Sequence, residues 1–433
     1  FHRPGYKFEA KTPEKWRKIG ACSRQVQYGL SIKMNEVGRG VPIYRLNEID
    51  NCFLGDSPSK YAPIASSVAQ QYRLEPNDVL FCRTNGNINY VGRTGIFLGT
   101  NNAVFASYLV KVKTNPDVIR PEYLTIYLNT RFGRRQILRR AMPSNQVNVS
   151  AAELKRIDIL LLDSEEQDEV ANLVVQAHEG RRKAFGLIQQ ADRALESEIG
   201  FDSLPLHHEV GYAASLSDAV VGNRIDGEYF QPKYQALRDA IKSYKHGFEL
   251  IIQVADALKP NIDPSQAPAS DFNYVELSQI NSALGMIEGH TESSGAGLPS
   301  RARRQVSAGD VIASAVVGSV DKVALISPAE DGYIASTGFF HFRPKTVSPE
   351  YLLMLVRSRC VSMQFQQQAT GGILSAVPDG RLKYVIVPRF PQKLQDKVTD
   401  LVAQAHQAKR ESDALLEQAK ARVEQLIEEA IEQ

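Results

Sequence analysis

Two long stretches of the chain carry apolar residues at three- and four-residue steps, the spacing of a helix with one apolar face. In residues 164–200 these positions are Val170, Leu173, Val174, Ala177, Ala184, Leu187, Ile188, Ala191, Leu195 and Ile199. In residues 391–433 they are Val398, Leu401, Val402, Ala405, Ser412, Leu415, Leu416, Ala419, Val423, Leu426 and Ile427. The pattern predicts two helices of about 35 to 40 residues, each about 50 Å long or more.

An apolar stripe of this length needs a packing partner along the whole helix. The other long helix is the most economical partner, and a mixed segment separates the two in sequence. The pattern therefore predicts an antiparallel coiled coil. The alternative is that each helix packs only on the domain next to it.

The segments before each long helix read as mixtures of strands and helices. Short β-branched and aromatic runs between Gly, Asn and Pro clusters predict strands; these runs are 78–82, 95–98, 106–112, 311–315, 322–326 and 339–343. Helical patterns follow at 121–140 and 349–368, each with a proline at its start, where helix geometry favours it.

The second half of the sequence repeats the first at an offset of 228 residues. Pro-Glu-Tyr-Leu at 121–124 recurs at 349–352, and Leu-Val-Val-Gln-Ala-His at 173–178 recurs as Leu-Val-Ala-Gln-Ala-His at 401–406. With small insertions, Asn77-Asp78-Val79-Leu80 also matches Gly309-Asp310-Val311-Ile312. Matches of this length at one offset indicate two copies of one structural unit.

The repeat predicts an α+β protein with two similar mixed α/β domains separated by the two long helices. The first domain covers 1–163, the first helix 164–200, the second domain 201–390 and the second helix 391–433. Because the chain begins at Phe1, inside the opening motif of the first copy, we expect that some N-terminal residues of the natural protein precede it.

Composition excludes several classes of protein. A chain of 433 residues with 43% hydrophobic and 23% charged residues is typical of a globular protein with more than one domain. No apolar run reaches the roughly 18 to 20 residues of a membrane span, and residues 1–11 lack a signal-peptide core, so we expect a cytoplasmic protein. The four cysteines form no CxxC pair, so we expect them reduced and buried rather than bound to metal.

Charge is unevenly distributed along the chain, although the net charge is only +2. Residues 1–163 contain 24 Lys and Arg against 13 Asp and Glu, a net charge of +11, whereas the three later segments have net charges of −4, −2 and −3. A polyanion would therefore bind most favourably to the first domain.

The ordered motifs within this repeat resemble the specificity subunit of Type I restriction-modification systems. The motifs are the two Asp-Val turns at 78–79 and 310–311, Glu-Glu-Gln at 165–167, and Arg-Ile-Asp-Gly-Glu-Tyr-Phe at 224–230. The second long helix departs from the pattern, because it opens with Gln-Lys-Leu-Gln at 392–395 and lacks the acidic pair.

The resemblance implies a DNA-reading subunit without a catalytic centre. Two target-recognition domains would each read one half of a bipartite double-stranded site, and the helices would set the gap and dock the methyltransferase subunits. Two copies of that subunit are implied, with S-adenosylmethionine bound in them and no cofactor in this chain. Motor-nuclease subunits would join for cleavage, and no membrane partner is implied.

Reading DNA requires side chains that reach base edges and cations that contact phosphates. In the first domain the candidates form an amide-rich loop with a following arginine, and an arginine-rich helix with a following polar turn. The loop set is Arg83, Asn85, Asn87, Asn89 and Arg93, and the helix set is Arg131, Arg134, Arg135, Arg139, Arg140, Asn145 and Gln146. Such amides can pair bidentately with adenine, but an Asn- and Gly-rich loop can also be only a turn. The helix arginines are candidates for phosphate contacts, or else form a solvated face.

The corresponding places in the second domain hold fewer cations. The candidates are Arg301, Arg303, Arg304, Ser319, Lys322, Gln367 and Thr370. Two different half-sites would require such divergence in the loops, although neutral drift of loops produces it too.

Two other functions compete with this interpretation. A DNA-modifying enzyme is the first alternative. A nuclease could use Asp117, Glu153 and Lys155 around a metal, although such loose spacing is common by chance. The sequence lacks a methyltransferase motif. A non-catalytic coiled-coil scaffold would bind proteins along its helices. The charge of the first domain and its amide-rich loop favour DNA.

Overall fold

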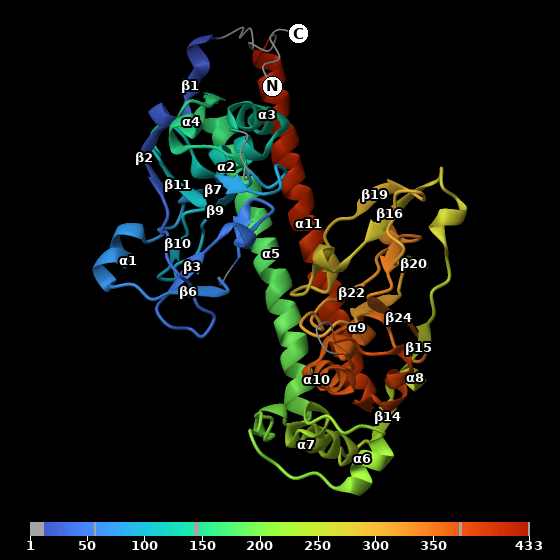
Figure 1. The fold of residues 1–433 in the computed structure, drawn as a ribbon. Helices are drawn as coiled ribbons and strands as arrows, with labels where there is room; N and C mark the ends of the chain where they lie inside the picture. Colours follow the sequence, from blue (N-terminus) through green and yellow to red (C-terminus); the bar gives the residue numbers. More distant parts are fainter. Residues whose placement is uncertain (1–12, 56–57, 143–146, 372–374, 432–433) are drawn as a thin grey trace. The chain divides into compact units, whose positions relative to one another are not determined.

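The computed structural model describes residues 13–55, 58–142, 147–371 and 375–431 (Figure 1). They form two compact units. Unit 1 contains the chain up to Arg181 together with the residues from Arg410 onward, and unit 2 contains Arg182–Lys409. The division cuts through both long helices, so each unit consists of a mixed domain, which we call its head, and half of each helix.

The head of unit 1 is built mainly from short strands. Its strands are β1 (Trp16–Lys18), β2 (Ser23–Tyr28), β3 (Val41–Tyr44), β4 (Ile49–Asp50), β5 (Phe53–Leu54), β6 (Lys60–Ala62), β7 (Val79–Cys82), β8 (Thr84–Asn85), β9 (Thr94–Ile96), β10 (Val104–Phe105), β11 (Leu109–Thr114), β12 (Val147–Asn148) and β13 (Asp158–Leu160). Its α-helices are α1 (Ser66–Tyr72), α2 (Pro121–Asn129), α3 (Arg131–Arg140) and α4 (Ala151–Lys155). The largest sheet has the strand order β2-β11-β7-β9-β5-β4.

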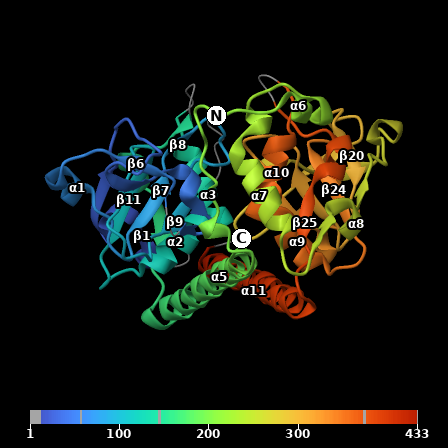
Figure 2. The same cartoon turned by 90° about the horizontal axis from the view of Figure 1, so that it is seen from below.

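The head of unit 2 repeats this arrangement. Its strands are β14 (Phe248–Leu250), β15 (Ala255–Leu258), β16 (Asp271–Val275), β17 (Ile280–Asn281), β18 (Met286–Ile287), β19 (Thr291–Ser294), β20 (Ala302–Gln305), β21 (Val311–Ser314), β22 (Val323–Leu325), β23 (Ile334–Ser336), β24 (Phe339–Pro344) and β25 (Ile386–Pro388). Its α-helices are α6 (Leu216–Gly222), α7 (Pro232–Lys242), α8 (Ile251–Val254), α9 (Pro349–Arg357) and α10 (Arg359–Gln368), and α7 and α10 lie side by side (Figure 2). The sheet order β15-β24-β21-β22 matches β2-β11-β7-β9 strand for strand.

The long helices are α5 (Ser164–Glu198) and α11 (Gln392–Ala430). In unit 1 the apolar stripe of the first half of α5 packs with the last part of α11 and with the head, in one core that contains Val174, Ala177, Leu416 and Val423. Ser412 Oγ donates to Ala177 O at 2.6 Å, and Arg422 pairs with Glu169 at 3.2 Å, so the two helices run antiparallel. The predicted fold class, two similar mixed domains with paired long helices, is confirmed.

Unit 2 pairs the opposite halves of the same helices. Ala184, Ile188 and Ala191 of α5 share a core with Val398 and Val402 of α11 and with the head. The alternative in which each helix packs only on its neighbouring domain is therefore wrong, because each head packs against both helices. Both helices also start at equivalent residues. At the start of α5 the side chains of Asp163 and Glu166 accept from each other's backbone N–H, whereas Pro391 and Leu394 stand at the equivalent positions of α11.

The helical segments predicted at 121–140 and 349–368 are each broken into two helices. Thr130 and Ser358, at equivalent repeat positions, have extended backbone and interrupt the helix. Each side chain accepts a hydrogen bond from a backbone N–H three residues later, Gly133 N at 3.2 Å and Val361 N at 3.4 Å. Hydroxyl residues favour this N-cap role, which is why the second helix begins there.

The four cysteines are buried and none forms a disulfide, as their isolation in the sequence predicted. Burial raises the pKa of Cys52 to about 12 and that of Cys82 to about 11. No helix in the described part of the chain is both long enough and apolar enough to cross a membrane.

Candidate nucleic-acid interface

The amide loop, which we define as residues 84–93, follows the buried strand β7 of unit 1. Its first two residues form β8, which pairs antiparallel with β12, so that Asn85 lies opposite Val147 and Thr84 opposite Asn148. This pairing joins the loop to the segment that follows α3. The two places that the sequence identified as candidates are therefore neighbours in the fold.

The side chains of Asn85 and Asn87 shape the loop itself. Asn85 Oδ1 accepts from Asn87 N at 2.8 Å, and Asn87 Oδ1 accepts from Asn89 N at 3.0 Å. Amides commonly hold a turn in this way, by accepting from the backbone two residues further on. The two asparagines thus have a turn-forming role, and the amide oxygen of each is directed at the loop backbone.

Arg134 of α3 faces the amide loop. Its guanidinium donates to Val91 O and, at 3.2 Å, to Asn89 O. Burial, with Arg93 nearby, lowers the pKa of this guanidinium. Gly92 has φ +85°, and a Cβ there would lie 2.7 Å from Arg134 Nη1, so glycine is needed where the helix meets the loop. In this position Arg134 supports the loop.

Aromatic rings support two further arginines of unit 1. The guanidinium of Arg93 lies 3.9 Å from the ring centroid of Tyr90, and that of Arg83 lies 4.8 Å from that of Tyr28. Arg93 is exposed, whereas Arg83 is half-buried and donates to Ser107 O at 3.3 Å. Both rings are partly exposed, Tyr28 at 41% and Tyr90 at 37%. Sequence reasoning missed these tyrosines; Tyr90, three residues before an arginine in the same loop, was the available signal.

The structure divides the remaining arginines of α3. Arg131 pairs with Glu424 at 3.2 Å and with Glu428, both on α11. Arg135 and Arg139 are exposed at the surface of unit 1. Asn145 and Gln146, the other candidates of this region, lie outside the described residues.

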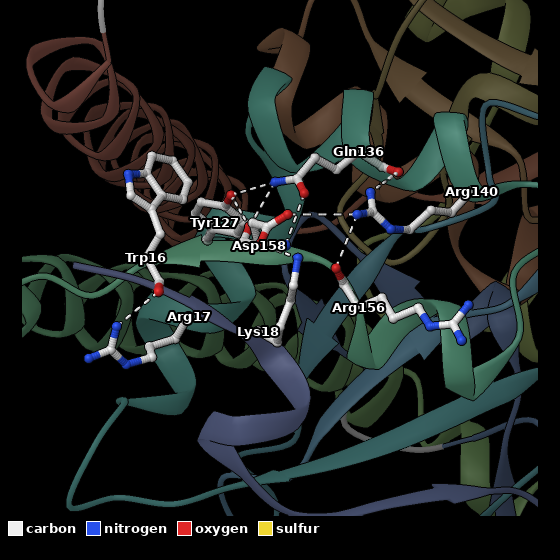
Figure 3. Close-up of polar contacts among 8 residues, drawn as sticks. All are labelled: Trp16, Arg17, Lys18, Tyr127, Gln136, Arg140, Arg156 and Asp158. Atoms are coloured by element: carbon white, nitrogen blue, oxygen red, sulfur yellow. Dashed lines mark hydrogen bonds and ion pairs between the residues drawn. The ribbon is translucent and has the colours of Figure 1, made fainter. Parts of the chain in front are cut away.

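Arg140 lies in a polar cluster between α3 and β13 (Figure 3). It donates to Gln136 O at 3.2 Å and Arg156 O at 3.0 Å, and its Nη2 is 3.7 Å from the Asp158 carboxylate. Lys18 pairs with the same carboxylate. The contacts of Arg140 therefore hold the head together.

In unit 2 the candidate arginines contact their own head. Arg301 bonds Tyr274 Oη at 3.2 Å and Glu276 at 3.0 Å. Arg303 pairs with Asp263, and the buried Arg304 donates to Leu258 O at 2.5 Å. Burial lowers the pKa of Arg304. Of the three, Arg301 keeps the most exposed side chain, at 59%.

The loop of unit 2 that corresponds to the amide loop also meets the segment after the second short helix. Val317 N donates to Ser375 O at 2.9 Å, and Thr370 is exposed and bridges to Ala376. The other candidates are engaged within the head: Ser319 Oγ contacts Ser314 Oγ at 2.9 Å, Lys322 donates to Ile280 O at 2.9 Å, and the buried Gln367 donates to Tyr229 O at 3.1 Å.

The acids proposed for a nuclease are used in ion pairs. Asp117 pairs with Arg24 at 3.2 Å, and Glu153 pairs with Arg156 at 2.6 Å. Within the described residues, no three His, Cys, Asp or Glu side chains cluster in a way that could hold a metal ion. These contacts give the nuclease interpretation no support.

Together these observations define a class of protein: two copies of one mixed α+β unit on paired long helices, with different polar loops on each copy. No family model matches the chain. Among curated proteins, it is similar to the Type I restriction enzyme EcoKI specificity subunit of Escherichia coli K12, with 26% identity over 181 residues. The match covers 38% of this chain and 39% of that protein, and it confirms the resemblance found in the motifs.

Alignments with two solved structures cover nearly the whole chain. The Type I restriction-modification S subunit from M. genitalium has 12% identity and a TM-score of 0.44, with 100% of this chain and 98% of that chain covered. The HsdS subunit from Thermoanaerobacter tengcongensis has 14% identity and a TM-score of 0.30, with 98% of each chain covered. Because these TM-scores lie below 0.5, nothing about function follows from them.

Proposed function

We propose that this chain is a DNA-binding specificity subunit of a Type I restriction-modification enzyme and has no catalytic centre of its own. Each head, at 1–163 and 201–390, would read one half of a bipartite double-stranded site. The observation that carries the proposal is the repeat. The two heads have equivalent buried frameworks, but their exposed loops differ. Two similar frameworks with different loops suit two different half-sites, and the similarity to the EcoKI specificity subunit supports the same function.

The chemistry would belong to partner subunits. We propose that the long helices, at 164–200 and 391–433, dock two methyltransferase subunits that bind S-adenosylmethionine, and that motor-nuclease subunits join for cleavage. The pure chain should then neither methylate nor cut DNA when it is supplied with S-adenosylmethionine, ATP and Mg²⁺. Turnover by the pure chain would contradict this part of the proposal.

The test of DNA reading is selection from randomised duplexes. The full chain is mixed at moderate salt with a duplex library, and the bound fraction is sequenced after several rounds. We expect two short blocks of preferred bases separated by a gap of fixed length. Binding without any sequence preference, with a strong salt dependence, would indicate a non-specific polyanion binder and would refute the proposal.

The helices can be tested as the element that sets the gap. Four residues are inserted into α5 after Arg181 and four into α11 after Lys409, where the two compact units divide. Each insertion adds about 6 Å, close to two base pairs of rise, and nearly keeps the apolar stripe in phase. We expect the selected gap to lengthen while both blocks stay the same.

Two-residue insertions at the same places are the matched control. They turn the following stripe by about 200° and should destabilise the chain without producing a new gap. If the four-residue variant stays folded and still selects the original gap, the helices do not set the spacing.

A protein-binding scaffold is the second candidate, and one observation favours it. Helix α6 and the residues around it expose large aliphatic side chains that no described residue covers; these are Leu216 at 80%, Val220 at 73%, Val221 at 88% and Ile225 at 93%. Exposed apolar groups of this kind often mark a protein contact. The selection experiment separates the two functions, because a scaffold would show no preferred sequence.

A further inference from the structure

The amide loop offers DNA a restricted set of chemical groups. The Oδ1 atoms of Asn85 and Asn87 accept hydrogen bonds from the loop backbone. A bidentate pair with adenine needs the amide oxygen to accept from the base while the amide nitrogen donates. Since both oxygens are turned toward the loop, the nitrogens are the groups left to face a ligand. The two asparagines therefore favour acceptor groups on bases.

Arg93 extends this set of donors. Its guanidinium has five N–H donors in a planar fork, and no acceptor. It is exposed and lies 3.9 Å from the centroid of the Tyr90 ring, and no ion pair or hydrogen bond joins its side chain to another described residue. Stacking on an aromatic ring restricts the plane of the fork before DNA arrives, so less conformational entropy is lost on binding.

The loop that carries these donors is fixed at several points. The β8–β12 pair holds its start, and the Arg134 guanidinium holds Asn89 O and Val91 O near its end. Arg93 follows directly after Gly92, the residue that packs against Arg134. A fixed loop with a planar donor at its end is suited to reading one base edge rather than many.

We propose that Arg93, stacked on Tyr90, reads a guanine in the major groove, with the amide nitrogens of Asn85 and Asn87 as neighbouring donors. This inference rests on the proposed function. In the major groove guanine presents two adjacent acceptors, N7 and O6, whereas adenine presents one acceptor beside a donor. A surface of donors therefore prefers guanine, and arginine pairs with it bidentately. The adenine pairing that the amides suggested from sequence is replaced by this assignment.

The experiment compares the full chain with its Arg93→Lys variant in the duplex selection described above. Lysine keeps the positive charge but lacks the planar fork. We expect the preference for guanine at one position in a selected block to fall in the variant, because an ammonium donates to N7 and O6 without the planar two-bond geometry, while the other selected positions and the overall affinity for unselected DNA stay unchanged. Arg73→Lys is the matched control, since Arg73 is an exposed arginine of the same head outside the loop.

Modified bases then identify the atom that is read. Replacing the guanine by 7-deazaguanine removes N7, and we expect affinity of the unmodified chain to fall by about 10-fold or more. The Arg93→Lys variant should show a smaller difference between the two duplexes, and Arg93→Ala, which has no donor, should bind both equally. Inosine, which keeps N7 and O6, should be bound as tightly as guanine. Tyr90→Leu should weaken the preference for guanine without abolishing it, because the fork remains but its support is lost.

Three results would overturn the inference. If the position lost in Arg93→Lys is an adenine, thymine or cytosine, the donor assignment is wrong. If selection occurs but no position responds to Arg93→Lys or to Arg93→Ala, the loop does not read DNA through this residue, and the proposed function still stands. If the unmodified chain selects no sequence at all, the proposed function fails and the inference fails with it.

Discussion

The two heads share buried side-chain hydrogen bonds at equivalent positions of the repeat. In unit 1, Gln136 Nε2 donates to Asp158 O at 2.7 Å and its Oε1 accepts from Asp158 N at 2.9 Å. In unit 2, Gln364 makes the same two bonds to Ile386, at 2.7 and 3.0 Å. Each bond pair joins the second short helix to the last strand of its head. The common fold of the two heads is therefore stabilised by specific buried hydrogen bonds as well as by apolar packing.

The heads also contact the long helices in equivalent ways. Arg131 pairs with Glu424 of α11 in unit 1, and Arg359 approaches Glu196 of α5 to 3.8 Å in unit 2. Arg359 lies 228 residues after Arg131, and Glu196 lies 228 residues before Glu424. Each head therefore places an equivalent arginine against an equivalent glutamate, on α11 in unit 1 and on α5 in unit 2. Arg131 therefore occupies a position that the repeat uses to join a head to a helix.

The buried aspartates of the two turns differ in their partners. Asp78 lies 3.5 Å from the Lys111 ammonium, whereas Asp310 accepts from His341 Nε2 at 2.6 Å and from two nitrogens of Arg343 at 2.8 Å. Burial raises the pKa of Asp78, with Lys111 opposing the shift. Burial acts on Asp310 in the same direction, but the bonds from His341 and Arg343 outweigh it and lower the pKa to about 2.

Removing the two aspartates should give the largest difference between the heads. Asp310→Ala leaves His341 buried without its partner and should cost unit 2 about 3–5 kcal/mol of unfolding free energy. Asp78→Ala breaks a weaker contact and should cost unit 1 about 1–3 kcal/mol. Both losses of unfolding free energy can be measured by denaturant titration, with hydrogen exchange used to monitor the unfolding of each unit. Equal losses would show that the extra bonds of Asp310 add no stability.

Removing the shared glutamines should destabilise both heads. Gln364→Leu leaves both the N–H and the C=O of Ile386 without their partner. Gln136→Leu leaves the Asp158 N–H without one, while Asp158 O still accepts from the Tyr127 hydroxyl at 2.5 Å. Each head should lose about 1–3 kcal/mol, and unit 2 should lose more. The exposed Gln71→Leu serves as the control and should change stability little. A larger loss in unit 1 than in unit 2 would contradict this assignment.

Acid should change the stability contributions of Asp310 and Asp78 in opposite directions. Asp310 has a lowered pKa in the folded protein, so its contribution is complete above the unfolded value of about 3.9 and is lost as the pH falls toward 2. Asp78 has a raised pKa, so the folded head binds a proton more readily and gains stability as the pH falls from 7. The measurement is the stability of each head relative to its Asp→Asn variant between pH 7 and pH 3. If both differences follow the same trend, the assigned pKa directions are wrong.

The smallest effect concerns the exposed arginines of α3. Arg135 and Arg139 stand where unit 2 has Met363 and Gln367. If Arg135 contacts a phosphate, Arg135→Ala should weaken all duplexes alike and lower the salt slope of binding by about one unit. Met363→Ala should leave the slope unchanged. A loss of preference at one base position in Arg135→Ala would instead assign this arginine to base reading.

The sequence by itself determined the repeat, the two long helices and the apolar stripe that pairs them, because periodic burial leaves a direct trace in the order of residues. It also indicated the turns at Asp78 and Asp310 and the polar loops after β7 and β21. It did not reveal that Thr130 and Ser358 would end a helix, since a hydroxyl residue is tolerated inside a helix as well as at its start.

Only the tertiary structure decided what Arg131, Arg134 and Arg140 of α3 contact. Arg131, Arg134 and Arg140 share one short basic segment with Arg135 and Arg139, yet the fold directs the first three toward α11, the amide loop and the Asp158 cluster. The fold also turned the oxygens of Asn85 and Asn87 inward and placed Arg93 over Tyr90. These outcomes depend on partners that are close in space, some of them nearly 300 residues away in the chain, and helical periodicity and local composition carry no information about such partners.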